Sequence, residues 1–429
     1  MVDKYWASLD EIHSHALNTV GKQVKDLVKV ETLEKYYAKP NNKGWIGNSI
    51  ESDQFGIANN SRKEADVPNL NLEIKVTPIR NTKHGWSAKE RLSLNIFDFD
   101  DEYKRDFDNA SFIEKANLIE LIYYEFIKDV PSPDLFVKAA TIFNLKEIPE
   151  EDMLIIKQDW EIIINKIKEG KAEELSDSLT KYLGATTKGG KSENNMTNQP
   201  FSEEEAHRRA FTLKGSYMTM LARQIMSGKY ELRHLRTSDE KVIKDISELN
   251  EKTFEEIVLD RFEPFIGMSK KELSIKLNVK IPTKNDKASS RVLAKKMLNL
   301  ENDMQETDEF KKAGIAVQIV TGNQANKRAT EGFKINIPGE DCIKPVDLVV
   351  ENWKDSILNE YLSNTQYLLV IFEKTKNGDI FRGAKFWRLS PDKLKEDVKD
   401  VWTDTKKKFS NGLNLKITPL SKNTATGRS

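Results

Sequence analysis

The chain has little cysteine, no long apolar run and no excess of charge of either sign. Its 429 residues include one cysteine, Cys342, which excludes a disulfide framework and zinc modules built on several cysteines. No stretch approaches the roughly 18 consecutive apolar residues of a membrane span, and the charged N-terminus lacks the apolar region of a signal peptide. We therefore expect a soluble cytoplasmic protein that has no membrane partner.

The balance of charge gives the whole chain no general attraction to nucleic acid. Lysine plus arginine and aspartate plus glutamate both number 68. Any polyanionic partner must therefore be bound where basic residues gather locally. Basic residues outnumber acidic ones between Lys181 and Arg236. This gathering is consistent with a DNA-binding surface, and a solvated basic face is the alternative.

The coarse pattern predicts alternating helices and strands, which is typical of an α/β or α+β fold. Apolar spacing and turn residues mark the segments. Helices are predicted over residues 3–30, from residue 45, over 112–126 and over 153–167; strands over 70–79 and 91–97; and a long polar loop over 184–200.

Three pairs of similar segments recur in the same order and at nearly the same separation. The pairs begin at Thr19 and Phe265, at Leu70 and Ala313, and at Trp160 and Trp402. Such a recurrence indicates two diverged copies of one domain. Coincidence among common helix and strand patterns is the alternative. We predict a first domain over residues 1–230, a linker over 231–252 and a second domain over 253–429.

The strongest local candidate for chemistry is the group Asp66, Glu73 and Lys75. Side chains two apart on a strand share a face, so Glu73 and Lys75 project together while the apolar residues between them enter a core. Pro68 and Asn69 allow a turn that returns Asp66 to the strand. Two carboxylates suit Mg²⁺, and a lysine can orient water and stabilise charge on a phosphate. A solvated strand face is the alternative for so short a pattern.

Four motifs in order carry a family resemblance. They are KGWIG at 43–47 with Glu51 after it, ADVPNLNLEIKVTPI at 65–79, QDWEIIINKIKEGKAEEL at 158–175 and RAFTLKGSYMTMLAR at 209–223. The chain resembles the MutH mismatch-repair nicking endonucleases, and its two-copy organisation looks like the Sau-type restriction endonucleases that cut at GATC. The resemblance implies a duplicated PD-(D/E)xK restriction-endonuclease-like fold, Mg²⁺ dependence and double-stranded DNA as substrate.

The resemblance also implies roles for the residues of the catalytic centre. By position, Asp66 and Glu73 match the metal ligands, and Lys75 matches the lysine that assists the attacking water. Glu51 completes the group of carboxylates. Lys115 matches a second active-site lysine, and a helix-surface lysine is its alternative.

Further residues match the DNA-binding parts of the family. Lys188 lies in the loop that reads bases, and Lys191, Arg208 and Arg209 are placed to hold phosphates. Tyr217 matches a residue at the DNA surface, with a core tyrosine as its alternative. Lysine suits the guanine acceptors of the major groove, which favours base contact through Lys188.

The second copy departs from the family at the catalytic positions. Ala316 stands opposite Glu73, Gln318 opposite Lys75, and Glu309 in the place of Asp66. A metal pair cannot be built from one carboxylate, so we expect a second half that does not cut. The resemblance implies that this half is a regulatory DNA-binding domain.

The resemblance therefore predicts a type II restriction endonuclease that cuts GATC and leaves 5′-phosphate ends. With one cutting centre per chain, cleavage of both strands predicts a homodimer formed on DNA, and a restriction system implies a cognate DNA methyltransferase. The alternatives are a strand-specific nicking enzyme of mismatch repair and a DNA-binding protein without catalysis.

Overall fold

The computed structural model describes most of the chain and divides it into two compact units. The described residues are 5–39, 44–57, 64–82, 85–188, 195–228, 230, 235, 240–281, 286–323, 328–329, 335, 337, 343–376 and 378–412. Unit 1 comprises Met1–Asp239, Ile243–Phe254 and Lys311–Ala313, and unit 2 comprises Glu240–Val242, Glu255–Phe310 and Gly314–Ser429. No helix in these ranges is both long and apolar enough to cross a membrane.

Unit 1 contains the larger share of the helices and strands. Its helices are α1 (Leu9–Leu17), α2 (Val24–Leu27), α3 (Val30–Ala38), α4 (Trp45–Asp53), α5 (Phe99–Glu102), α6 (Ser111–Ala116), α7 (Glu150–Lys168), α8 (Gly215–Met226) and α9 (Glu248–Glu251). Its strands are β1 (Leu72–Thr82), β2 (Gly85–Ala88), β3 (Leu92–Phe97), β4 (Leu118–Glu125), β5 (Val137–Asn144), β6 (Leu183–Thr187), β7 (Met196–Thr197), β8 (Ala206–His207) and β9 (Arg209–Leu213).

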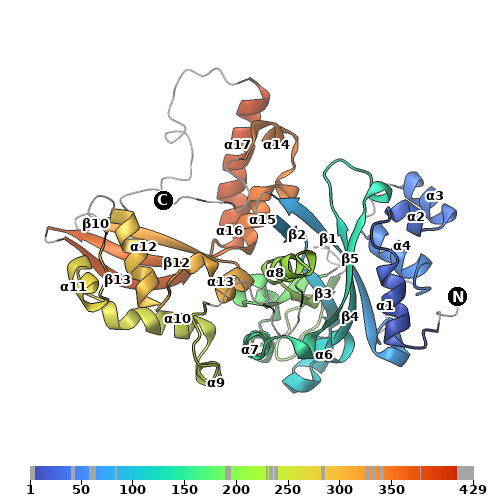
Figure 1. Cartoon of the computed structure of the whole chain (residues 1–429), viewed down its shortest axis with the longest axis horizontal. Helices are drawn as coiled ribbons and strands as arrows, with labels where there is room; N and C mark the ends of the chain where they lie inside the picture. Colours follow the sequence, from blue (N-terminus) through green and yellow to red (C-terminus); the bar gives the residue numbers. More distant parts are fainter. Residues whose placement is uncertain are drawn as a thin grey trace. The chain divides into compact units, whose positions relative to one another are not determined.

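A four-stranded sheet in the order β2-β1-β4-β5 forms the centre of unit 1. β1 and β4 run parallel, with Leu72 beside Leu118 and Ile74 beside Glu120, while the two edge strands pair antiparallel. Alternate side chains of β1 point to opposite faces, so Leu72 and Ile74 are fully buried on one face and Glu73 lies on the other. Helices α1 to α4 lie along one side of the sheet and α8 along the other (Figure 1).

The N-terminal helices share an apolar core with the sheet. The core includes Trp6, Ile12, Ala16, Val24, Leu27, Tyr36, Trp45, Ile46, Ile50, Phe55, Leu72 and Ile74. The predicted single helix over 3–30 is wrong, because α1 ends at Leu17, α2 covers only Val24–Leu27 and α3 begins at Val30. Between α1 and α2, Gly21 has a φ of 83°, a conformation that glycine adopts readily and that a right-handed helix cannot contain.

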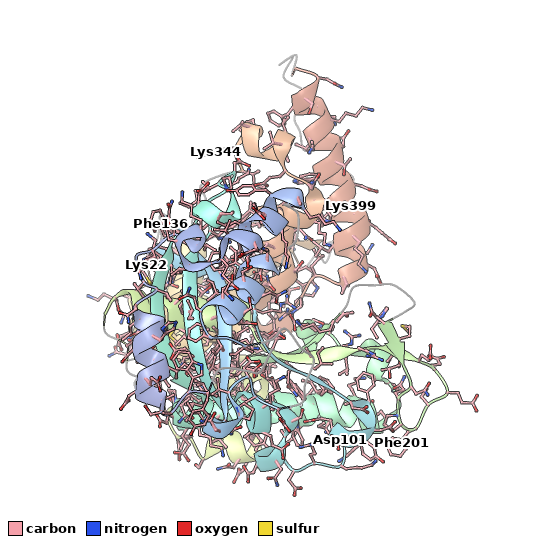
Figure 2. All side chains as sticks on the ribbon, turned by 90° about the vertical axis from the view of Figure 1, so that its right-hand side faces the viewer. Lys22, Asp101, Phe136, Phe201, Lys344 and Lys399 are labelled. Atoms are coloured by element: carbon pink, nitrogen blue, oxygen red, sulfur yellow. The ribbon has the colours of Figure 1, made fainter. Side chains whose placement is uncertain are left out.

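The turn at Gly21 joins the helices to the edge of the sheet. Its N–H donates to the Val137 carbonyl on β5 (2.9 Å), and the Val137 N–H donates to the Lys22 carbonyl (3.0 Å). Lys22 and Phe136 accordingly lie side by side in Figure 2. Two reciprocal backbone bonds therefore fix this turn against β5.

The predicted helix over 112–126 is wrong beyond its first turn. Helix α6 ends at Ala116, and residues 118–125 form β4 in the middle of the sheet. The segment LIELIYYE is apolar and rich in β-branched and aromatic residues, and a short run of this kind suits a buried strand as well as a helix. Parallel pairing with β1 decides the outcome. The predicted helices at 45 and 153–167 and both predicted strands are confirmed as α4, α7, β1 and β3.

A second sheet of unit 1 has the antiparallel order β3-β9-β6. Arg209 on β9 pairs with Phe97 on one side and Thr187 on the other. The predicted loop over 184–200 therefore begins as a strand, because residues up to Thr187 belong to β6. Residues 189–194 of that loop lie outside the described residues.

The predicted linker over 231–252 is not a free connection in its second half. Residues 243–254 belong to unit 1, where α9 packs near α7. The Gln158 side-chain amide donates to the carbonyls of Leu249 (2.7 Å) and Lys252 (2.9 Å). These bonds attach the segment to the long helix of unit 1.

Unit 2 is built around its own four-stranded sheet. Its elements are α10 (Phe254–Phe262, of which Phe254 falls in unit 1), α11 (Lys270–Lys276), α12 (Asp286–Met297), α13 (Asp308–Ala313, of which 311–313 fall in unit 1), β10 (Ile315–Asn323), β11 (Arg328–Ala329), α14 (Pro345–Val350), α15 (Ile357–Asn364), β12 (Gln366–Thr375), β13 (Gly378–Trp387), α16 (Pro391–Lys393) and α17 (Lys399–Ser410).

The sheet of unit 2 has the order β11-β10-β12-β13. β10 and β12 run parallel, and β11 and β13 pair antiparallel at the edges. Before α11, Gly267 has a φ of 87° and donates its N–H to the Phe381 carbonyl on β13 (2.8 Å). The Phe381 N–H donates to the Met268 carbonyl (2.9 Å). A glycine turn is thus joined to β13 by two reciprocal backbone bonds.

Candidate active site

Asp66 reaches the central sheet because a tight turn reverses the chain before β1. Val67 and Leu72 exchange backbone hydrogen bonds of 2.9 and 3.2 Å around the 3-10 turn Pro68–Leu70. The predicted turn is confirmed. As a result, the Asp66 carboxylate lies beside β1, where its Oδ2 accepts the Ile74 N–H at 3.0 Å.

Glu73 is the centre of a charged cluster on the face of β1 opposite the α1–α4 core. The residue is 2% exposed, and its Oε2 accepts the Asp66 N–H at 3.2 Å. Its Oε1 lies 2.5 Å from Nζ of Lys75, two residues along the strand, and 3.8 Å from Nζ of Lys115 on α6. The structure therefore brings together four predicted residues, Asp66, Glu73, Lys75 and Lys115.

Glu51 on α4 interacts electrostatically with the charged groups of this cluster. Burial raises the pKa of Glu51 to about 7, with Lys75 opposing the shift. The charges of Asp66 and Glu73 add to the increase. Glu51 is therefore close enough to the cluster for its protonation to depend on the others, as predicted for a third carboxylate.

The two central residues of the cluster have shifted pKa values. Burial raises the pKa of Glu73, and Lys75 opposes this shift only in part. Burial alone lowers the pKa of Lys75, but Glu73 and Asp66 outweigh it, so the pKa of Lys75 is raised. Glu73 is thus a buried carboxylate whose burial cost the neighbouring lysines offset only in part, which is the electrostatic setting of a cation site.

The donors of the cluster fit Mg²⁺. Within the described ranges, no group of three or more His, Cys, Asp or Glu side chains forms a preformed metal site. Mg²⁺ does not require one, because it retains several waters and takes one or two carboxylates. Asp66 and Glu73 supply two hard oxygen donors on neighbouring segments. The side chains present therefore suit a hydrated divalent cation.

Lys188 stands at the end of β6, close to the charged cluster. Its N–H donates to the Arg208 carbonyl at 2.9 Å, which extends the pairing of β6 by one residue. Burial lowers the pKa of Lys188, and the charge of Lys75 lowers it further. The two ammonium groups are therefore near enough to repel each other. Lys191, the neighbouring candidate, lies outside the described residues.

The remaining DNA-binding candidates differ in exposure. Arg208 is exposed, as a phosphate contact requires. Arg209 is only 7% exposed and donates to Thr187 Oγ1 (3.0 Å) and the Glu173 carbonyl (3.3 Å). Tyr217 is fully buried and donates its hydroxyl to Asp152 (3.0 Å). The burial of Arg209 and Tyr217 argues against a direct contact of either side chain with DNA and, for Tyr217, favours the alternative of a core tyrosine.

Several buried carboxylates of unit 1 escaped prediction, among them Asp159 and Glu120. Asp159 on α7 accepts the N–H groups that precede and begin β6, and Glu120 on β4 lies 3.0 Å from Nδ1 of His13. One feature of the sequence pointed to each of them. The acidic residue stands on the face of its helix or strand where the other residues are apolar. Glu120 is on the face opposite Glu73, because it pairs with Ile74.

The pair of Glu120 and His13 predicts a dependence of stability on pH. Burial raises the pKa of Glu120 to about 8, and burial lowers the pKa of His13 against the opposing charge of Asp10. At neutral pH the uncharged acid therefore donates to the uncharged imidazole. Because the folded pKa of Glu120 exceeds the ordinary value of 4.5, the contribution of Glu120 to stability is full below about pH 4.5 and is lost as the pH rises through about 8. The lowered pKa of His13 acts in the opposite sense, since protonation of the imidazole below its ordinary pKa of 6.5 favours the unfolded chain.

We expect the free energy of unfolding to fall by up to a few kcal/mol across that range. Thermal melts of the wild type and of the Glu120→Gln variant between pH 5 and 9 measure this fall. The variant keeps a hydrogen-bonding side chain without a titrating proton, so its stability should change less with pH. Equal slopes for the two proteins would contradict the assignment.

Comparison with known proteins places these residues in a family. The MutH family, described as DNA mismatch repair enzyme MutH, matches residues 55–159, which contain Asp66, Glu73, Lys75 and Lys115. The DNA mismatch repair protein MutH of Shewanella woodyi is 24% identical over 185 residues, which is 43% of this chain and 77% of that protein. The MutH protein of Buchnera aphidicola is 25% identical over 173 residues, 40% of this chain and 76% of that protein.

A longer similarity covers both units. The type II restriction enzyme Sau3AI of Staphylococcus aureus is 33% identical over 423 residues, which is 95% of this chain and 81% of that enzyme. The MutH proteins match less than half of the chain, whereas this enzyme matches nearly all of it. The chain therefore belongs to the MutH family of nucleases and, within it, to the type II restriction endonucleases that resemble Sau3AI.

Proposed function

We propose that this endonuclease hydrolyses phosphodiesters of double-stranded DNA at GATC in an Mg²⁺-dependent reaction, leaving 5′-phosphate ends, and that a cognate methyltransferase protects the host. One observation carries the catalytic part. Glu73 is buried beside Asp66 and lies within 4 Å of two lysine ammonium groups. Burying a charged carboxylate costs free energy, and groups that bear this cost are typical of sites that bind a metal ion and a phosphate.

The residues of the cluster have separate roles in this proposal. Asp66 and Glu73 would hold Mg²⁺, which when bound supplies a more acidic water and neutralises charge on the phosphate. Lys75 orients a water by donating to it from the face of β1. Lys115 adds positive charge for the scissile phosphate. Glu51 is placed to accept a proton at the edge of the cluster.

We further propose that residues 1–230 form the catalytic domain and residues 253–429 a diverged copy of it. The central sheets support this, since β2-β1-β4-β5 and β11-β10-β12-β13 share the sequence of antiparallel, parallel and antiparallel pairings. The glycine turns support it too. Gly21 and Gly267 both have positive φ, and each is joined by two reciprocal backbone bonds to the fourth strand of its sheet.

The catalytic positions of the second copy hold uncharged residues. The third residue of β1, Ile74, donates its N–H to Asp66, and the third residue of β10, Val317, donates to Oε1 of Gln305 at the same distance, 3.0 Å. Gln305 therefore takes the place of Asp66. The expectation for Glu309 is corrected, because that side chain lies on α13 and accepts the Val242 N–H at 2.9 Å.

With Gln305, Ala316 and Gln318 at these positions, the second copy has neither the carboxylates nor the lysine of the first. An amide can replace a carboxylate as a hydrogen-bond acceptor, but it is a poorer ligand for Mg²⁺. This supports a second half that does not cut. A regulatory DNA-binding role for it remains part of the proposal.

One cutting centre per chain and a self-complementary site favour a homodimer assembled on DNA. Supercoiled plasmid that carries one GATC site tests the function and the dimer together. With Mg²⁺ we expect linear product ending at GATC, a rate that rises faster than linearly with protein concentration, and no product in EDTA. Nicked circles alone would favour strand-specific nicking, and binding without any cleavage would favour a DNA-binding protein.

A further inference from the structure

The strand that carries Lys188 is held at its start by a buried carboxylate. Asp159 on α7 accepts the N–H groups of Lys181, Tyr182 and Leu183 at 2.7, 2.6 and 2.9 Å. Asp159 is 1% exposed, and three N–H donors compensate its burial. This end of β6 is therefore fixed to the longest helix of unit 1.

The other end of β6 is held by the guanidinium of Arg209. Its Nη1 donates to Thr187, the residue before Lys188, and its Nη2 donates to the Glu173 carbonyl. In the part of the chain that the structure describes, no carboxylate lies within 4.0 Å of this guanidinium, and its Nε has no hydrogen-bond partner. Burying a guanidinium whose hydrogen-bond partners are uncharged costs free energy of folding. Arg209 is therefore better explained by a need to hold its partners in position than by a gain in stability.

Arg208 differs from the adjacent Arg209 in both its contacts and its exposure. Its backbone accepts from the Lys188 N–H and donates to the Asn195 carbonyl, both at 2.9 Å, so it joins the two described residues on either side of 189–194. Its side chain is exposed, whereas that of Arg209 is buried. Two adjacent arginines, Arg208 just before β9 and Arg209 as its first residue, therefore face opposite surroundings.

We propose that Arg209 is a positioning residue that, through the Thr187 hydroxyl, fixes Lys188 for reading of the DNA site. The proposal rests on the role proposed for Lys188. Without the hydrogen bond, the end of β6 and Lys188 after it can shift. A displacement of about 1 Å in a reacting complex can cost on the order of a hundredfold in rate. Arg209 thus affects selectivity without touching DNA.

The test compares the variants Thr187→Val, Arg209→Lys, Arg208→Ala and Lys188→Ala. Thr187→Val removes the acceptor with little change of shape, so it reports on the bond even if Arg209→Lys folds poorly, and thermal melts check the folding of each. The first readout is the ratio of kcat/KM for a duplex with GATC to that for a duplex with one changed base pair. The second is the slope of log Kd against log salt concentration in EDTA.

Thr187→Val and Arg209→Lys should each lower the selectivity ratio about tenfold or more and leave the salt slope unchanged, because no phosphate contact is lost. Arg208→Ala, the matched control, should lower the slope by about one and keep the ratio. Lys188→Ala should lower the ratio, and adding Arg209→Lys to it should lower the ratio no further.

Three results would overturn the proposal. A lower salt slope for Arg209→Lys with an unchanged ratio would make Arg209 a phosphate contact. An unchanged ratio for both Thr187→Val and Arg209→Lys would leave Arg209 a structural residue only, while Lys188→Ala still reports separately on the reading role. If the wild type itself shows no preference for GATC, the proposed function fails, and the positioning role fails with it.

Discussion

The Glu73→Gln variant is expected to cut DNA slower than the wild type by a factor on the order of 10³ or more. Metal-ion stabilisation is worth several kcal/mol of barrier, and each 1.36 kcal/mol is about tenfold in rate. Glutamine is the same size, and its one carbonyl oxygen can keep either the bond from the Asp66 N–H or the bond from Lys75, which Glu73 accepts on separate oxygens. It lacks the charge that a divalent cation requires.

DNA affinity in EDTA should stay within about tenfold of the wild type, because phosphate contacts by basic residues supply most of it. Asp66→Asn should behave like Glu73→Gln. Single-turnover cleavage of a labelled GATC duplex and a binding titration in EDTA measure the two effects.

Glu120→Gln is the matched control for this prediction. Glu120 is as buried as Glu73 and belongs to the strand beside it, but it lies on the opposite face of the sheet. The same chemical change there should leave cleavage within a few fold. If both glutamine variants lose activity equally, the loss reflects the sheet and not a metal site.

The second large effect is expected at Gly170, which ends α7. Its φ is 69°, and a Cβ at this position would lie 2.5 Å from the Phe201 carbonyl oxygen. Gly170→Ala combines a strained backbone, roughly 1–2 kcal/mol, with a backbone collision of roughly 1–3 kcal/mol. We expect a loss of about 2–5 kcal/mol in the stability of unit 1.

Gly228 and Gly412 separate the two contributions. Both follow a helix with φ of 68° and 72°, and no atom of the described residues lies within 4 Å of an added Cβ at either. Alanine at these positions should cost the strain alone. The difference in melting temperature between Gly170→Ala and Gly228→Ala therefore measures the collision with Phe201. Equal losses would show that the Phe201 segment moves aside freely.

Much of the catalytic centre could be predicted because its geometry is local. Glu73 and Lys75 share a face of one strand, and the turn at Pro68 needs only neighbouring residues to return Asp66 to that strand. Short-range backbone chemistry of this kind is visible in the order of residues. The same holds for the glycine turns at Gly21 and Gly267.

The sequence predictions that failed concern the burial of side chains and the pairing of segments that lie far apart in the chain. Residues 118–125 have an apolar pattern compatible with helix or strand, and only the parallel pairing with β1 makes them β4. The adjacent Arg208 and Arg209 have the same side-chain chemistry. Only the pairing of β9, which begins at Arg209, with β3 and β6 buries Arg209 while Arg208 before it stays exposed.

The sequence by itself determined the group of Asp66, Glu73 and Lys75, the strand that carries it and the family of nucleases. Only the tertiary structure decided that Lys115 meets Glu73, that Tyr217 is core, and that Gln305 accepts the Val317 N–H in unit 2. The physical reason is the distance along the chain over which each kind of interaction acts. Alternation and turns act over a few residues, whereas burial and hydrogen-bond partners depend on segments far apart in the chain.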